Sequence, residues 1–147
     1  KCQLISRLVI IKKEVLTMKI LVGYKGTDVG KDLMDIAVKH AKAFNGEILI
    51  VTSMVGGDKT ETQKLVDAEK NLAQAKVYFD DFGVKSQTHL LVRGFEAGED
   101  IVTFAKEKDI DEIIIGVRSR SKVGKLIFGS TAQVVILDAQ CPVLTVK

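Results

Sequence analysis

From Met18 to the end of the chain, short apolar runs alternate with longer segments in which apolar residues recur at helical spacing. The short runs are typical of buried strands, and the longer segments are typical of amphipathic helices. Strands that alternate with helices connect through right-handed crossovers and form a mostly parallel sheet. The strands are apolar enough to be covered on both sides. The sequence therefore predicts an α/β fold, a five-stranded parallel sheet with helices on both faces.

The expected boundaries follow from turn and cap residues. We expect strands at 20–23, 48–52, 86–92, 113–115 and 142–146. We expect the first helix to begin after a cap at 26–28 and to stop at Asn45-Gly46. The second helix is predicted at 60–82, the third around Ala97 to Ala105, and the fourth from Ala132 to Ala139.

Composition narrows the functional classes. A chain of 147 residues with 46% hydrophobic and 28% charged residues is typical of one globular domain. Its two cysteines stand near opposite ends, and its two histidines, His40 and His89, are far apart in the sequence. These residues indicate neither a disulfide framework nor a metal cluster, and they disfavour catalysis by histidine. We therefore assign no metal ligand and no catalytic residue, and we expect a reducing, cytoplasmic location.

The formal charge of +3 comes from the front of the chain. Residues 1–17 contain four basic residues and one acidic residue, whereas the remainder carries equal numbers of both. A neutral remainder gives no support for nucleic-acid binding. Because Met18 opens a clean strand pattern, we expect residues 1–17 to be an extension that is not part of the domain at 18–147.

A basic, glycine-containing loop follows the fourth predicted strand. It runs from Gly116 to Gly129 and ends on Gly129-Ser130-Thr131, where the last helix begins. A helix start offers unpaired backbone N–H groups and the positive end of the helix dipole, which suit a phosphate. A second candidate segment, 23–27, follows the first strand. Ligands of parallel sheets bind beyond the carboxyl ends of the strands, so both segments are candidates for one crevice.

Two common phosphate-binding motifs are absent from the sequence. A P-loop needs G-x-x-x-x-G-K-[ST], but Gly124-Lys125 is followed by Leu126 and the first glycine position holds Ser119. The dinucleotide fingerprint needs G-x-G-x-x-G after the first strand, and the glycines there have another spacing.

The remaining pattern resembles the universal stress protein family. Its nucleotide-binding members carry G-x-x-G, nine residues and then G-[ST]. This chain has Gly116-x-x-Ser119, nine residues and then Gly129-Ser130. The order of strands and helices and the ending Cys141-Pro142-Val143-Leu144-Thr145-Val146 are also similar. The resemblance covers Met18 to Lys147.

The resemblance implies an adenine nucleotide α-hydrolase-like, Rossmann-like sandwich that binds ATP. Carried over by motif position, it implies that Gly129 allows a close backbone approach and that Ser130 and Thr131 hold phosphate oxygens. It does not fix whether Mg²⁺ accompanies the ligand. The implied nucleotide-binding residues are Tyr24, Lys25, Ile115, Gly116, Ser119, Gly129, Ser130 and Thr131, with Arg118, Arg120, Lys122 and Lys125 as cations near the phosphates.

Two positions depart from the family pattern. Ser119 replaces the second motif glycine and adds a Cβ where the backbone would approach the ligand. Lys25 stands where the family usually has an aspartate that faces adenine and ribose, and a lysine cannot accept a hydrogen bond from a base amino group. Both substitutions leave the identity of the base open and favour an anionic ligand.

Two functions remain open. The first is a cytoplasmic regulatory stress-response protein that binds ATP or a related nucleotide as a homodimer, without a membrane or nucleic-acid partner. The alternative is a dimeric interaction module of the same fold that binds no ATP or binds another anion. The resemblance implies pairing through the last strand, with Val143, Leu144 and Val146 as its apolar edge. No base or metal-binding carboxylate accompanies the loop, so any ATP hydrolysis is expected to be slow.

Several other residues have simple structural interpretations. We expect His40 to be packed and hydrogen-bonded, His89 to face solvent, and Cys141 to be an unreactive, buried thiol. Glu99 and Asp100 are expected to interact with the dipole of the third helix. Core positions are expected at Phe79, Phe82 and Phe104.

Overall fold

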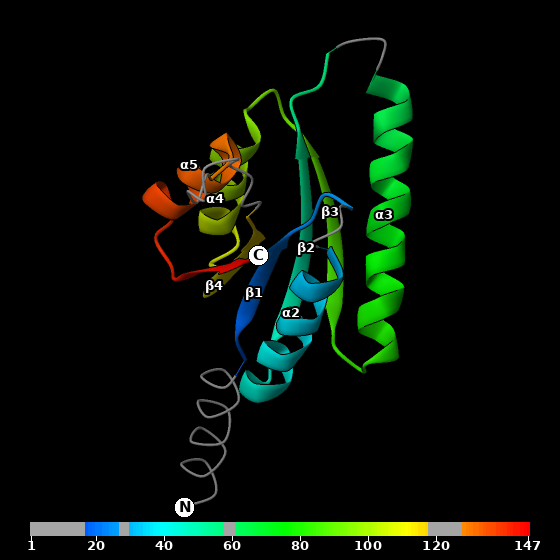
Figure 1. Ribbon diagram of the computed structural model, residues 1–147, viewed down its shortest axis with the longest axis vertical. Helices are drawn as coiled ribbons and strands as arrows, with labels where there is room; N and C mark the ends of the chain where they lie inside the picture. Colours follow the sequence, from blue (N-terminus) through cyan, green and yellow to red (C-terminus); the bar gives the residue numbers. More distant parts are fainter. Residues whose placement is uncertain (1–16, 27–29, 58–60, 118–127) are drawn as a thin grey trace, which may run out of the picture.

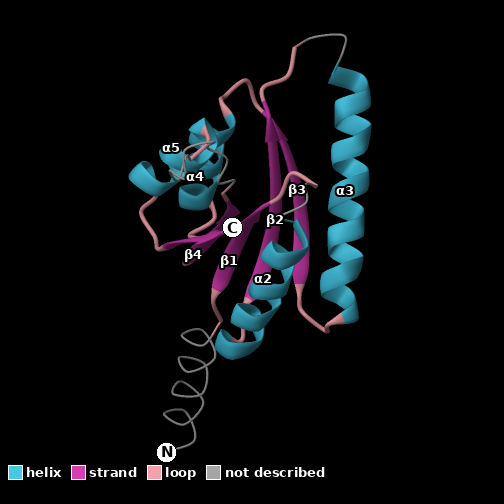
Figure 2. Cartoon of the chain, in the orientation of Figure 1, coloured by secondary structure: helices cyan, strands magenta, loops and turns pink. Residues whose placement is uncertain are grey.

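The computed structural model describes residues 17–26, 30–57, 61–117 and 128–147. Five parallel strands form one sheet in the order β3-β2-β1-β4-β5, and four helices connect them (Figures 1 and 2). The strands are β1 (Lys19–Gly23), β2 (Glu47–Met54), β3 (Ser86–Val92), β4 (Glu112–Gly116) and β5 (Val143–Val146). The helices are α2 (Gly30–Phe44), α3 (Glu61–Asp81), α4 (Ala97–Glu107) and α5 (Ser130–Asp138). The predicted fold class is confirmed.

The strand order reverses beside β1. The chain first builds outward from β1 to β2 and β3, and then returns to the other side of β1 to add β4 and β5. At the carboxyl end of β1, Gly23 pairs with Val51 of β2 and with Ile115 of β4. β2 continues to Met54 while paired only with β3. The carboxyl ends of β1 and β4 therefore lie side by side where the strand order reverses, which is the place where ligands of such sheets bind.

Alternate strand residues supply two cores. One face of the sheet packs under α2 and α3, through Leu33, Ala37, Leu72 and Phe79. The other face packs under α4 and α5, and it includes Leu21, Leu49, Val51, Ile113 and Ile115. Figure 1 shows the two helix pairs on opposite sides of the sheet. The central strands are buried on both faces, which explains their nearly continuous apolar sequence.

Local signals at the ends of α2 and α3 act as the sequence indicated. Asn45 follows α2 with a φ of 50°, in the left-handed region that asparagine tolerates. The backbone N–H of Gly46 then donates to the carbonyl of Ala41. Gly83, with a φ of 69°, ends α3 in the same way. The predicted cap of α2 at 27–28 lies outside the described residues.

Helices α4 and α5 touch at a glycine. A Cβ built on Gly98 would lie 2.7 Å from the Cβ of Val134 and 3.2 Å from the carbonyl oxygen of Thr131. Both atoms belong to the neighbouring helix and neither is the flexible end of a side chain. The absence of a side chain at Gly98 therefore lets α5 lie close against α4, with its first turn at the sheet edge.

Three expectations about aromatic residues and histidines need comment. Phe79 and Phe104 are core residues, but Phe82 is 43% exposed because it follows the last turn of α3, and its predicted core position is wrong. His40 donates or accepts a 3.0 Å hydrogen bond through Nδ1 with Glu112, as expected of a packed histidine. His89 does not simply face solvent, since its ring lies 4.9 Å from that of Phe104.

Burial has a chemical effect at His89 and at Cys141. The Nε2 atom of His89 is buried and has no hydrogen-bond partner among the described residues. Burial, together with the nearby charge of Lys108, lowers the pKa of His89. Burial raises the pKa of the Cys141 thiol, which agrees with an unreactive cysteine.

We predict that Gly98→Ala destabilises the protein, because α5 must move to accept the methyl group. The overpacking should cost about 1–3 kcal/mol, which exceeds the roughly 1 kcal/mol that alanine gains over glycine within a helix. Urea unfolding measures the difference. Thr103→Ala, at an exposed position of the same helix, is the control and should unfold like the parent protein. Equal stability of Gly98→Ala and the parent would contradict the packing argument.

We predict that the stability of the folded protein depends on the titration of His89. Its pKa is lower in the folded protein than the ordinary value of 6.5, so the unfolded chain binds the proton more tightly. The contribution of neutral His89 to the free energy of unfolding is therefore complete above pH 6.5. It is lost as the pH falls below 6.5 and through the pKa of His89 in the folded protein. Unfolding free energies measured between about pH 7.5 and 5.5 should fall more steeply for the parent than for His89→Leu. Parallel curves for the two proteins would refute this assignment.

Candidate functional site

A cavity of about 380 Å³ lies at the carboxyl ends of β1, β2 and β4, against the first turns of α4 and α5. This is the place where the strand order reverses. Its walls combine apolar side chains with backbone and hydroxyl groups, as is common for small-molecule sites. The lining residues are Gly23, Tyr24, Lys25, Val51, Thr52, Ser53, Ala97, Ile101, Ile115, Gly116, Val117, Gly129, Ser130, Thr131 and Ala132.

One wall of the cavity is the start of α5. Gly129 is the N-cap, with extended backbone and no capping side chain, and its carbonyl accepts the N–H of Gln133. The N–H groups of the cap and the first turn have no acceptor within the helix, because the helix begins at Ser130 and has no carbonyl group one turn before them. These donors and the helix dipole make this wall suitable for an anion.

Gly129 keeps this wall open. Its φ of −64° is accessible to any residue, so the turn itself does not require glycine. A Cβ built on Gly129 would meet no described atom within 4 Å. Since Gly129 lines the cavity, a side chain there would occupy space next to the helix start. The close backbone approach implied by the resemblance is therefore available at this position.

Tyr24 and Lys25, which follow β1, also line the cavity. The Tyr24 backbone is fully used within the protein: its N–H donates to the carbonyl of Val51 at 2.9 Å, and its carbonyl accepts the Thr52 hydroxyl at 2.5 Å. The Tyr24 ring is buried against Gly30 of α2, and burial raises its pKa. Lys25, by contrast, is exposed and lines the cavity.

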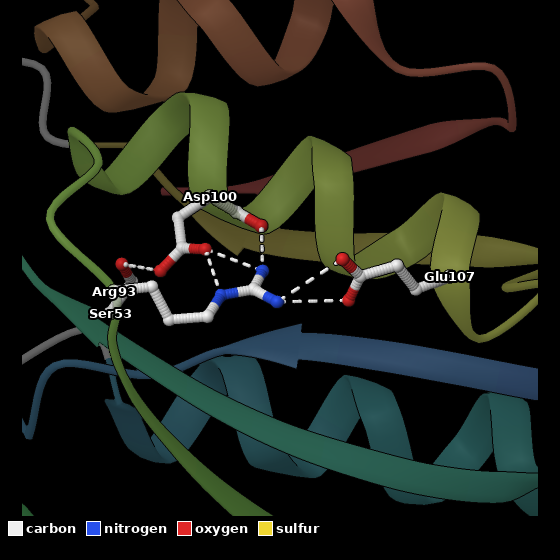
Figure 3. Close-up of polar contacts among 4 residues, drawn as sticks. All are labelled: Ser53, Arg93, Asp100 and Glu107. Atoms are coloured by element: carbon white, nitrogen blue, oxygen red, sulfur yellow. Dashed lines mark hydrogen bonds and ion pairs between the residues drawn. The ribbon is translucent and has the colours of Figure 1, made fainter.

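An ion pair between the buried Asp100 and the partly exposed side chain of Arg93 supports the wall at the end of β2 (Figure 3). Asp100, in the first turn of α4, is completely buried. Its Oδ2 accepts the Ser53 hydroxyl at 2.7 Å, and its Oδ1 accepts Nε of Arg93 at 2.7 Å. Arg93 also donates to Glu107 at 2.9 Å. The hydrogen bond to Glu107, and to a smaller extent the one to Asp100, raises the pKa of Arg93, although burial acts to lower it. Asp100 thus has a role beyond its expected interaction with the helix dipole.

The structure brings most of the predicted site residues together. Seven of them, from three separate segments, line the same cavity: Tyr24, Lys25, Ile115, Gly116, Gly129, Ser130 and Thr131. Their role in binding remains a prediction. The other five, Ser119, Arg118, Arg120, Lys122 and Lys125, lie outside the described residues.

Several wall residues were not predicted from the sequence. Ser53 belongs to β2, whose expected end at residue 52 was too early by two residues. Ala97 and Ile101 were predicted only as residues of the third helix. Both line the cavity, and Ile101 is also part of the core beneath α4 and α5. The polar residue Ser53 at the carboxyl end of an otherwise apolar run was the available signal.

The described part of the chain contains neither a candidate metal site nor a candidate membrane span. Over residues 17–26, 30–57, 61–117 and 128–147, no three acidic, histidine or cysteine side chains are grouped so that they could hold a metal ion. No helix within the same ranges has the length and hydropathy that crossing a membrane requires.

Known proteins of the same architecture identify the family. The sequence model of the universal stress protein family matches residues 17–147. A universal stress protein of Methanocaldococcus jannaschii is 32% identical over 145 residues, covering 91% of this chain and 84% of the relative. The structure of a universal stress protein from Archaeoglobus fulgidus is 37% identical with a TM-score of 0.81, covering 89% of this chain and 98% of its own.

A further structure of the universal stress protein from Archaeoglobus fulgidus was solved in complex with dAMP. It is 32% identical with a TM-score of 0.76, covering 90% of this chain and 99% of that one. The family model, the sequence relatives and the shared sheet order all lead to one assignment: this chain belongs to the universal stress protein family.

Proposed function

We propose that this protein binds a nucleotide in the cavity beside β1, with the phosphates at the start of α5. The observation that carries the proposal is that no described atom lies within 4 Å of a Cβ built on Gly129, next to the N–H groups of the first helical turn. The cavity volume of about 380 Å³ falls in the range of small-molecule sites. The dAMP complex of a relative that is 32% identical adds support for a nucleotide.

The ligand in this proposal is ATP or a related nucleotide. The phosphates lie against Gly129, Ser130 and Thr131, and the sugar lies over Ile115 and Gly116 at the end of β4. The proposal includes no catalytic residue, because binding needs only positioned donors and a shaped wall. We propose a regulatory role in the cytoplasm, in which occupancy by the nucleotide is the signal.

Lys25 favours a second candidate function. Lys25 is exposed and lines the cavity, so its positive charge adds to that of the helix start at the same site. A ligand with more than one negative group, or an acidic group of a protein partner, would suit such a site. The second candidate is therefore an interaction module that binds another anion in place of ATP.

We also propose that two copies pair through β5, which lies at one edge of the sheet. On the side facing β4, the carbonyls of Pro142 and Val146 accept the N–H groups of Ile113 and Val117. Since backbone groups alternate along a strand, those of Val143 and Thr145 point to the open edge. An open edge of this kind is a template for pairing with another strand.

The side chains of β5 need a correction to the apolar edge expected from the sequence. Val146 is only 5% exposed, because it packs in the core beneath α2 and α3. Val143 and Leu144 are half-buried against the two opposite faces of the sheet. Pairing through β5 would therefore depend on its backbone groups, with Val143 and Leu144 as the apolar side chains beside them.

The nucleotide proposal predicts that Gly129→Val abolishes binding and keeps the fold. The valine fills the space beside the helix start. Because valine is a poorer N-cap residue than glycine, the substitution should lower the free energy of unfolding by no more than about 1 kcal/mol. A thermal-shift assay with ATP measures binding, because ligand at about one hundred times its dissociation constant stabilises the parent by roughly 2.7 kcal/mol. Chromatography of the denatured parent protein tests for nucleotide that was already bound.

Glu96→Val is the matched control for this experiment. Glu96 is the N-cap of α4 with nearly the same backbone angles as Gly129, and it does not line the cavity. This variant should keep the thermal shift of the parent. If adenine nucleotides neither shift the parent nor are released from it, the interaction module becomes the better interpretation. A Gly129→Val protein that still binds ATP would place the ligand elsewhere.

The pairing proposal predicts that Thr145→Pro produces monomers. Proline removes an N–H at the open edge, and it leaves the hydrogen bonds to β4 intact because those come from neighbouring residues. Size-exclusion chromatography with light scattering should show dimers for the parent and for Thr145→Ala. A parent protein that is monomeric at high concentration would refute pairing through this edge.

A further inference from the structure

Ser53 lies at the end of the cavity that is remote from α5. It is the penultimate residue of β2, two strands away from β4 at the point where β2 extends past β1. Its side chain shares a face of the sheet with Leu49 and Val51, which is the face that α4 and α5 cover. Two strand spacings amount to about 10 Å. A ligand with its phosphate at the start of α5 can therefore reach Ser53 with its other end.

The hydroxyl proton of Ser53 is already used within the protein. Ser53 Oγ donates to Oδ2 of Asp100 at 2.7 Å, and an ionised carboxylate has no proton of its own to donate. A serine hydroxyl has one proton and two lone pairs. What Ser53 can still offer to a ligand is therefore hydrogen-bond acceptance alone.

Arg93 fixes the orientation of this pair. Its Nε and terminal nitrogen atoms both approach Oδ1 of Asp100, so Oδ2 remains for Ser53 (Figure 3). Arg93 is held in turn by two contacts to Glu107, at 2.9 and 3.2 Å. Because Asp100 is completely buried, water does not compete for its oxygens. The direction of the Ser53 proton is thus set by charged groups in the loop after β3 and on α4.

We propose that Ser53, positioned by Asp100, selects nucleotides that carry an exocyclic amino group on the base. An amino group of the base donates to the available lone pairs of Ser53. A carbonyl oxygen at the same place has no proton to donate, so it would face the Ser53 oxygen without a hydrogen bond. This inference rests on the proposed nucleotide function, and it concerns which base the site takes. Asp100 acts through Ser53 and is a positioning residue.

Isothermal titration with AMP and IMP tests the proposal, since these ligands share the sugar and phosphate and differ at position 6, an amino group in AMP and a carbonyl in IMP, and at the adjacent N1, which carries a proton only in IMP. The parent protein should bind AMP roughly tenfold more tightly than IMP, the ordinary effect of leaving a polar group unpaired. Ser53→Ala removes the acceptor, so the ratio should fall to about one. Ser86→Ala, the same substitution at the amino end of β3, should keep the ratio of the parent.

Asp100→Asn gives a readout that a merely structural role would not produce. Its amide oxygen should remain toward Arg93, because an N–H there would face the donors of the guanidinium group. The amide N–H then donates to Ser53 and frees the serine proton to donate into the cavity. The preference should shift from AMP toward IMP. If this variant does not fold, Ser53→Ala still decides the question.

The outcomes separate the two proposals. Equal binding of AMP and IMP by the parent would overturn the selection by Ser53 and leave the nucleotide function intact. A preference for AMP that survives Ser53→Ala would likewise overturn it. Binding of neither nucleotide would refute the proposed function and this inference together.

Discussion

Burial of both faces of the parallel sheet is the constraint on which the rest of the structure depends. Parallel strands must be covered on both sides, so the chain has to place one helix pair on each face. It does so by building outward from β1 in one direction and then in the other. The cavity lies at the carboxyl ends of β1, β2 and β4, where this reversal occurs. The position of the cavity is therefore a consequence of core formation, independent of any ligand.

The chemical character of the cavity comes from two contacts of α4. Gly98 allows α5 to approach closely, which sets the N–H groups of the first turn of α5 along one wall. Asp100 holds Ser53 along another wall and removes its donor capacity. The cavity thus has donors at the end near α5 and an acceptor at the end near β2. The groups of a nucleotide are complementary to these, because its anionic phosphate oxygens accept hydrogen bonds at one end and its base lies at the other.

The sequence predicted the fold well because each element carried its own local signal. Apolar runs marked the strands, and Asn45 and Gly83 marked helix ends through backbone conformations that few residues tolerate. The cavity lining was predicted around the motif residues Gly116 and Gly129 and in the segment after the first strand, at Tyr24 and Lys25. The role of Asp100 was missed, because its partners Ser53 and Arg93 come from other elements and nothing in its neighbours reveals complete burial. Phe82 was misplaced for a related reason: helical spacing continues to it, but α3 ends at Asp81.

The first turn of α4 contacts both ends of the cavity. Gly98 meets α5 and Asp100 meets Ser53, and these two residues are separated by a single position in one helix. The spacing between the start of α5 and Ser53 therefore depends on contacts made by a single turn of α4. A molecule shorter than this spacing can contact the start of α5 or Ser53 but not both, so one turn of α4 sets the minimum length of a ligand that spans the cavity.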